Sequence, residues 1–308
     1  MKNIPIILAM ILIIYSPFIG QVDIILKDIL DSSSISYQIF WEIRVPRVIV
    51  GFFVGSLLSI GGLVFQSIFR NSLSSPYTLG VASGASLGVG VGVVFGFVGM
   101  GWLFGFIGAL STIVIHLIIS MKIQRYDSSS MLLVGISLSF FYSALFMIIL
   151  YISNLEESYE IIRFTMGSLE NTLSDALILS CVSIIILFIV IFFKKELRFL
   201  LISHQYALLK GINVVKVDYI LLISISIGVG VAVSITGPIG FVGLIIPHII
   251  REIYQKSSDR LILEIFFYGG IFLIFCDMIA RVGSSDIPIG VVSSSFGAPL
   301  MIYLILRR

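Results

Sequence analysis

Residues 44–88 read RVPRVIVGFFVGSLLSIGGLVFQSIFRNSLSSPYTLGVASGASLG, and this stretch decides the fold. Two arginines, Arg44 and Arg47, open it, and no further charge follows until Arg70. A helix needs roughly 20 apolar residues to cross the hydrocarbon core of a bilayer, so the uncharged run is long enough for one span. The stretch therefore predicts a membrane protein.

A second apolar segment follows the polar break at 70–76, and small residues recur in it. It contains Ser83 and, at four-residue spacing, Gly84, Gly88, Gly92 and Gly96. Small residues at this spacing let a neighbouring backbone pack closely in lipid. We predict that the run lines a path or forms a hinge, and static helix packing explains the same glycines equally well.

Composition extends this prediction to the whole chain. The 308 residues are 58% hydrophobic and 12% charged, which is typical of one polytopic, all-α membrane domain. The net charge of +2 is too small to indicate a nucleic-acid partner. Cys181 and Cys276 both lie in apolar runs, so we interpret them as packing residues and expect no metal or cofactor site.

Apolar runs predict ten membrane spans, the first of them an uncleaved span rather than a signal peptide. The runs are 4–19, the span that begins at Arg44, 79–98, 102–119, 131–151, 176–193, 219–235, a short one at 241–250, 261–279 and 289–306. Ten spans place both termini on one side of the membrane.

The distribution of Lys and Arg assigns that side to the cytoplasm, because cytoplasmic loops carry the excess of basic residues. Fourteen of the 19 basic residues lie on it: Lys2, Arg70, Lys122, Arg125, Lys194, Lys195, Arg198, Lys210, Lys216, Arg251, Lys256, Arg260, Arg307 and Arg308. The external five are Lys27, Arg44, Arg47, Arg163 and Arg281.

A second break lies before the eighth span. Three glycines and two prolines fall within residues 237–247, so the segment cannot be a plain helix. Broken backbone at membrane depth usually lines a path or supports a moving joint, and a tight turn between two helices is the alternative. The candidate path or hinge residues here are Gly237, Pro238, Gly240 and Gly243. We interpret the lone His248 as a capping or hydrogen-bonded histidine.

Four motifs carry a resemblance to a known family. They are RVPR at 44–47, QSIFRNSLSSPYTLG at 66–80, GPIGFVGLIIPHIIR at 237–251 and DIPIGVVSSSFGAP at 286–299. In this order they resemble the permease subunits of ABC importers for iron-siderophore complexes, haem and vitamin B12. The resemblance extends from about Trp41 to the C-terminus. It implies ten spans per subunit, a second permease subunit that is identical or related, and ATP-binding subunits on separate chains.

The external arginines acquire a role from this resemblance. A charge at the centre of a membrane helix costs roughly 2.5 to 3.5 kcal/mol on insertion scales, so we expect them to face water or a partner. The resemblance implies that Arg44, Arg47 and Arg281 form salt bridges to glutamates of an extracellular substrate-binding protein. Anchoring at the lipid headgroups is the alternative. Asp277, one turn before Arg281, is expected to neutralise part of its charge.

The basic connection at 194–218 is the expected docking surface for the ATPase, with a solvated loop as the alternative. The resemblance implies two short coupling helices with an Ala-x-x-Leu-Gly pattern between them. The matching residues are Ala207, Leu208, Leu209, Lys210 and Gly211, with lysine in place of the usual leucine.

No lysine follows a glycine in this chain, so it contains no P-loop and is expected not to be an enzyme. We predict an importer permease for an iron-siderophore complex or haem in a bacterial cytoplasmic membrane; a cobalamin importer is the alternative. An ion-coupled transporter would need acidic residues at mid-membrane, and the one candidate, Asp277, lies near the outer end of its span beside Arg281. Residues 84–88 match the G-x-S-x-G pattern of hydrolases but lie in a glycine-rich helix.

Overall fold

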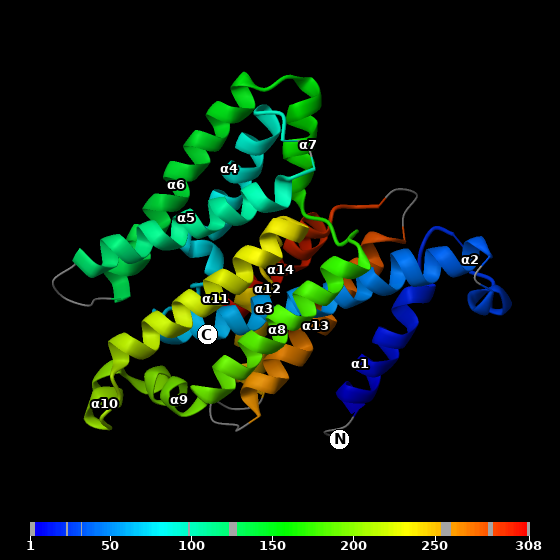
Figure 1. The fold of residues 1–308 in the computed structure, drawn as a ribbon. Helices are drawn as coiled ribbons and strands as arrows, with labels where there is room; N and C mark the ends of the chain where they lie inside the picture. The colour runs from blue at the N-terminus through cyan, green and yellow to red at the C-terminus, as the bar shows by residue number, and fades with distance from the viewer. Residues whose placement is uncertain are drawn as a thin grey trace.

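The computed structural model describes residues 4–22, 24–31, 33–97, 99–122, 128–253, 260–282 and 286–306, and these contain helices and no strand (Figure 1). The α-helices are α1 Ile4–Tyr15, α2 Ile35–Gln38, α3 Val45–Ile68, α4 Val81–Val94, α5 Gly101–Lys122, α6 Ser128–Ile152, α7 Leu155–Met166, α8 Leu173–Phe192, α9 Lys194–Ile202, α10 His204–Leu209, α11 Val214–Thr236, α12 Val242–Ile253, α13 Leu261–Ala280 and α14 Ile289–Leu306. Shorter turns are η1 Ser16–Phe18, η2 Leu26–Leu30, the π-helical η3 Ile39–Arg44 and η4 Pro76–Leu79.

The helix α3 is the centre of the bundle. Together with α2 and η3 it forms one continuous helix of 34 residues, Ile35–Ile68, whose most apolar window is 83% buried. Ser34 caps its start by accepting a hydrogen bond from the Tyr37 N–H. The helices α8, α11, α12 and α13 all pack against α3. The uncharged run in the sequence therefore forms the protein core rather than a lipid-facing helix.

Glycines decide how closely the helices approach α3. A Cβ added to Gly55 would overlap the carbonyl oxygen of Gly269 in α13, and one added to Gly62 would overlap that of Gly243 in α12. Close backbone contact of this kind replaces the packing of larger side chains in membrane helices.

The helices α4, α5 and α6 pack against one another beside this centre, with α7 against α4. Gly84 lies against the carbonyl oxygen of Gly108, and Gly88 lies against that of Phe104. Static packing of α4 on α5 thus accounts for both glycines. Ser83 accepts a 3.5 Å hydrogen bond from Ser143 of α6.

Each of the ten predicted apolar runs coincides with one helix. Six helices are long and apolar enough to cross a membrane among the residues that the structure describes, and α1, α4, α12 and α14 are shorter. The chain is therefore a multi-pass membrane protein, and the count of ten spans stays a prediction.

One helix was not expected. The helix α7 occupies the predicted external loop, where Asn154 and Glu157 form a capping box. The Glu157 N–H donates to Asn154 Oδ1, and the Asn154 N–H donates to Glu157 Oε2, both at 2.9 Å. The Asn-x-x-Glu spacing was a readable start signal.

The bundle has two distinct ends (Figure 1). The helices α9 and α10 lie at the lower left in this view, whereas α7 and α2 lie at the top and at the right, with α8 and α11 running between. These two ends correspond to the two groups of basic residues described from the sequence. Which end lies in the cytoplasm and which outside stays a prediction. Five of the residues counted as cytoplasmic lie outside the described ranges: Lys2, Arg125, Lys256, Arg307 and Arg308.

Candidate functional site

The three predicted docking arginines lie together at the α7 end, and all are buried. Arg44 is 5% exposed, Arg47 6% and Arg281 4%. In this subunit the three side chains therefore face the protein interior rather than water, and their docking to a partner stays a prediction. Desolvation of a charge is costly unless partners replace the water, so the chain must supply partners for each guanidinium group.

Carboxylates surround Arg47. Its Nε donates to Asp277 Oδ1 at 2.8 Å, and its Nη1 donates to Glu170 Oε1 at 3.1 Å and Asp286 Oδ2 at 2.9 Å. Arg281 Nη2 lies 2.9 Å from Asp277 Oδ2. The prediction that Asp277 neutralises Arg281 within its own helix is confirmed, and the same carboxylate also pairs with Arg47.

Arg44 and Arg281 additionally hold the segment that follows α1. Arg44 Nη1 donates to the Pro17 carbonyl at 3.0 Å, and its Nη2 donates to that of Val22. Arg281 Nη1 donates to the Ile19 carbonyl at 2.9 Å, and its Nη2 donates to Ser16 Oγ at 2.9 Å. Arginine suits this task because its planar fork carries five donors.

We call this group the arginine cluster: Arg44, Arg47, Arg281, Asp277, Glu170 and Asp286. Arg47 and Arg281 pair with these carboxylates, and Arg44 donates to backbone carbonyl groups. The cluster ties α3 and α13 to the α7–α8 and α13–α14 connections. In this subunit the arginines therefore stabilise the surface at the α7 end through contacts within the chain.

The broken segment is non-helical from Gly237 to Phe241, as predicted. The Ile239 N–H donates to the Tyr77 hydroxyl at 3.0 Å, which ties the segment to η4. Phe241 has a φ of 68°, a left-handed conformation that costs a non-glycine residue roughly 1–2 kcal/mol. Gly237 has a φ of 70° and packs on the carbonyl oxygen of Phe164 in α7.

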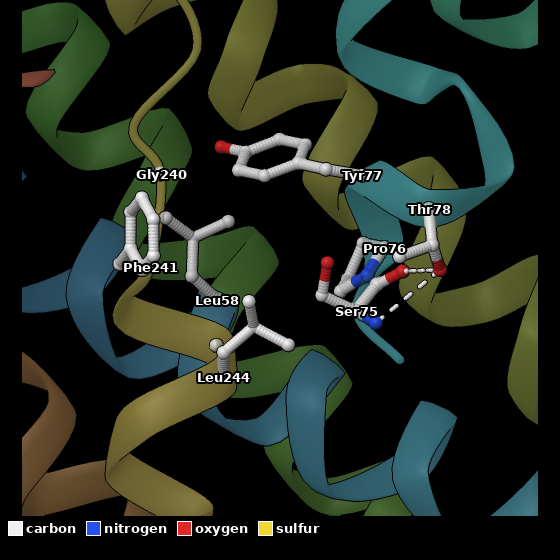
Figure 2. Close-up of a pocket in the computed structure, with 9 residues that line it drawn as sticks. Leu58, Ser75, Pro76, Tyr77, Thr78, Gly240, Phe241 and Leu244 are labelled. Carbon is white, nitrogen blue, oxygen red and sulfur yellow. Dashed lines mark hydrogen bonds between the residues drawn. The ribbon is translucent and has the colours of Figure 1, made fainter. Parts of the chain in front are cut away.

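Two cavities meet at this segment. The inner cavity, of about 310 Å³, lies between the segment and η4 (Figure 2). It is lined by Leu58, Ser75, Pro76, Tyr77, Thr78, Gly240, Phe241, Gly243 and Leu244.

The outer cavity, of about 640 Å³, lies at the α7 end. It is lined by Thr165, Met166, Pro238, Gly240, Gly290, Val291, Ser294 and Ser295. Gly240 lines both cavities, so three of the four predicted path residues of this segment, Pro238, Gly240 and Gly243, border open space.

The predicted docking loop forms two short helices, α9 and α10. Ala207 is fully buried, whereas Leu208 is 58% and Leu209 84% exposed. Gly211 ends α10 with a φ of 79°: its N–H donates to the Leu208 carbonyl, and the Ile212 N–H donates to the Ala207 carbonyl. This Schellman arrangement explains the glycine and leaves two leucines exposed at the tip of the bundle.

Lys210 stands where the family pattern has leucine. It is exposed and directly follows α10. Its Nζ lies 5.5 Å from the centroid of the Tyr206 ring, which is a cation–π distance.

A model of the FecCD transport family matches residues 8–307. The chain belongs to this family. A Helicobacter pylori protein named probable iron chelatin transport system permease protein is 33% identical over 277 residues, 89% of this chain and 84% of that protein. The vitamin B12 import system permease protein BtuC of Vibrio cholerae is 30% identical over 283 residues, 90% of this chain and 85% of that protein.

A solved structure described as an inward-facing conformation of a metal-chelate type ABC transporter superposes with a TM-score of 0.88 at 27% identity. The match covers 98% of this chain and 97% of that one. The resemblance to ABC importer permeases is therefore confirmed, and so is the all-helical permease fold. This FecCD chain is a transport permease.

Sequence reasoning missed the two loop carboxylates of this FecCD chain. Glu170 and Asp286 lie 123 and 239 positions from Arg47, and such a separation leaves no local signal. With Arg47, Arg163 and neighbouring backbone they line a further cavity of about 130 Å³. Arg163 Nη2 lies 3.8 Å from Glu170 Oε2, and its side chain is 67% exposed.

The two loop carboxylates respond differently to their surroundings. Burial raises the pKa of Glu170, and its hydrogen bond with Asp286 raises it further, against the lowering effect of the Arg47 charge. Burial also acts to raise the pKa of Asp286, but hydrogen bonds from Arg47 and Glu170 outweigh it and lower that pKa. Glu170 is therefore the first of the pair to accept a proton.

This difference predicts a pH dependence of stability. A native pKa above the unfolded value means that the folded state binds the Glu170 proton more tightly. Thermal stability should therefore rise as pH falls from neutrality through the raised pKa of Glu170. Thermal unfolding between about pH 7 and 4.5 measures it, and Glu170→Gln should remove this rise. An identical pH profile in that variant would contradict the assignment.

Proposed function

We propose that this FecCD permease moves an iron-siderophore complex or haem across a bacterial cytoplasmic membrane. The observation that carries the proposal is the family match over residues 8–307, together with the iron-chelatin permease that is 33% identical. Cobalamin is the second candidate, favoured by the similarity to BtuC. An extracellular binding protein would deliver the cargo, and both termini would lie in the cytoplasm.

ATP-binding subunits would supply the energy and dock at α9 and α10. The exposed Leu208 and Leu209 support this role, because apolar side chains at an exposed helix end are suited to a protein partner. The chain lacks a P-loop, so ATP hydrolysis is assigned to the partner. Movement of this tip by the closing ATPase pair would rock the helices and open the path alternately to each side.

A second permease subunit, identical or related, would complete the path. The inner and outer cavities both open at the surface of this subunit, so a partner is needed to enclose them. The Ser130–Ile152 part of α6 is 11% buried and leaves a large surface for lipid and that partner. The high similarity to an inward-facing transporter supports an inward-facing state of this structure.

The binding protein would dock at the α7 end. Direct salt bridges from Arg44, Arg47 and Arg281 would require the internal pairs of the arginine cluster to open. Arg163 needs no such change, because its side chain is 67% exposed beside Glu170. The arginine cluster would therefore stabilise the docking surface before the binding protein arrives. On docking, its internal ion pairs would open, and the guanidinium groups would pair with glutamates of the binding protein.

Uptake measurements test the cargo. A strain lacking the gene for this chain should lose uptake of a radiolabelled ferric siderophore or of haem, and expression of the chain should restore it. Loss of cobalamin uptake alone would select the second candidate. Unchanged uptake of all three compounds would refute the proposed function.

Charges at the α10 tip should uncouple the permease from its motor. We expect the double variant Leu208→Asp with Leu209→Asp to weaken ATPase binding at least tenfold. It would place charges in the interface where two apolar side chains made contacts, and a loss of about 1.4 kcal/mol in binding free energy already gives a tenfold weaker affinity. Pull-down of the ATPase and uptake measure the effect. Leu155→Asp, at a residue 90% exposed on α7, is the matched control and should bind the ATPase normally. Normal ATPase binding by the double variant would exclude this docking surface.

A further inference from the structure

Phe241 combines a large side chain with a backbone conformation that favours glycine. Phe241 and Arg70 are the two non-glycine residues with a positive φ in the part of the chain that the structure describes. The Phe241 carbonyl accepts hydrogen bonds from the Leu244 and Ile245 N–H groups, both at 3.0 Å, and so begins α12. A residue held in such a conformation depends on its surroundings to keep it there, and such residues cluster at ligand clamps and switch regions.

Phe241 directly follows the residue that the two cavities share. It lines the inner cavity with Leu58 and Leu244, opposite η4 (Figure 2). The preceding residue, Gly240, lines both cavities. On the α14 side Phe241 packs on Gly297, where an added Cβ would collide with its side chain.

Helix α14 therefore contacts both sides of this junction. Its first turns, with Gly290 and Ser294, line the outer cavity, and Gly297 follows against Phe241. A small displacement of α14 relative to α12 would change the space available to the ring.

We propose that Phe241 is a gate residue that closes the passage between the outer and the inner cavity. The inference deepens the proposed permease function by naming the residue that interrupts the path within this subunit. The left-handed backbone directs the ring into the passage, and packing against Gly297 holds it. Rotation of the Phe241 backbone out of the left-handed region would move the ring away. Because Gly297 of α14 packs against the ring, a shift of α14 would permit this rotation and so give the gate an open and a closed position.

Accessibility of cysteines tests the gate without cargo or nucleotide. Cys181→Ser and Cys276→Ser give a cysteine-free background. Ser75→Cys then reports on the inner cavity, and Ser295→Cys reports on the outer cavity. The nucleotide-free complex with its ATPase is placed in vesicles that expose the α9–α10 side, and a membrane-impermeant maleimide is added there. Glu157→Cys, on α7, should stay unlabelled and confirms the orientation.

With Phe241 present, the reagent should label Ser75→Cys and leave Ser295→Cys protected. Phe241→Ala should increase the labelling rate of Ser295→Cys at least tenfold. Phe241→Gly should do the same, and because glycine adopts a left-handed φ readily, this variant keeps the native backbone. Leu244→Ala enlarges the inner cavity without removing the ring and should leave the rate unchanged.

Three results would overturn the gate. They are labelling of Ser295→Cys while Phe241 is present, continued protection in both Phe241 variants, and an equal increase in Leu244→Ala. None of these results depends on which compound the permease transports. A wrong cargo assignment would leave the labelling pattern intact, whereas a missing gate would change it.

Discussion

Arg47→Ala is expected to lower the stability of the permease by about 3–5 kcal/mol, because removing one partner of a buried ion pair leaves the other charge uncompensated. Asp277 is 1% exposed and would keep Arg281 as its ion-pair partner. Glu170 and Asp286 would lose the guanidinium group that holds the two loops to α3. Thermal unfolding in detergent and uptake in cells should both show a severe loss.

The matched control is Arg163→Ala. Arg163 belongs to the same end of the molecule, but its side chain is 67% exposed and pairs with Glu170 at 3.8 Å. Exposed pairs of this kind contribute about 0–1 kcal/mol, so the unfolding temperature should change little. Equal stabilities of the Arg47 and Arg163 variants would refute the structural role of the arginine cluster.

The same variants separate docking from internal stabilisation. Arg44→Glu combined with Arg47→Glu should abolish uptake and weaken docking of the binding protein, while ATPase assembly survives. If the arginines act through the shape of the surface, docking and thermal stability will fall together. A loss of docking at unchanged stability would instead indicate direct contact with the partner, and normal docking affinity would exclude both roles.

Gly62→Ala is expected to have the second largest effect, a loss of about 3 kcal/mol at the upper end of the usual cost of overpacking. The new Cβ would overlap the carbonyl oxygen of Gly243, which backbone geometry holds in place. Gln66 lies one turn further along α3 and donates to the Gly243 and Leu244 carbonyls, both at 3.3 Å. Arg251 Nη2 donates to Gln66 Oε1 at 2.8 Å, so a displaced α12 would also lose these bonds.

Thermal unfolding and the yield of folded permease measure this effect. Gly101→Ala in α5 is the control, because an added Cβ there meets its nearest neighbour, Val89 Cγ1, at an ordinary 3.8 Å. Alanine is the better helix former, so that variant should be neutral or slightly stabilised. A Gly62→Ala permease as stable as the Gly101→Ala control would contradict the close contact of α3 with α12.

Local patterns predicted the helical elements. The uncharged run predicted α3, and the glycines and prolines from Gly237 onwards predicted the end of α11. The capping pair Asn154 and Glu157 also indicates the start of α7, a helix that lies between two predicted apolar runs and was not expected. Each of these signals acts between residues a few positions apart, where helix hydrogen bonds and caps are formed.

The arginine cluster shows why the site was harder to predict. Its position at one end of the bundle followed from the distribution of basic residues, but the burial of Arg47 did not. Arg47 pairs with Asp277 across 230 positions, and a charge at a span end satisfies the sequence pattern equally well in water and in protein.

The sequence by itself determined that this chain is a helical membrane permease of one family, because hydropathy, breaks and short motifs are local properties. The tertiary structure alone decided which charges compensate one another, which glycines permit close helix contact, and that Phe241 lines the inner cavity next to Gly240, which borders both cavities. These depend on the packing of helices distant in the sequence, where burial determines the cost of each charge and the space left for each side chain.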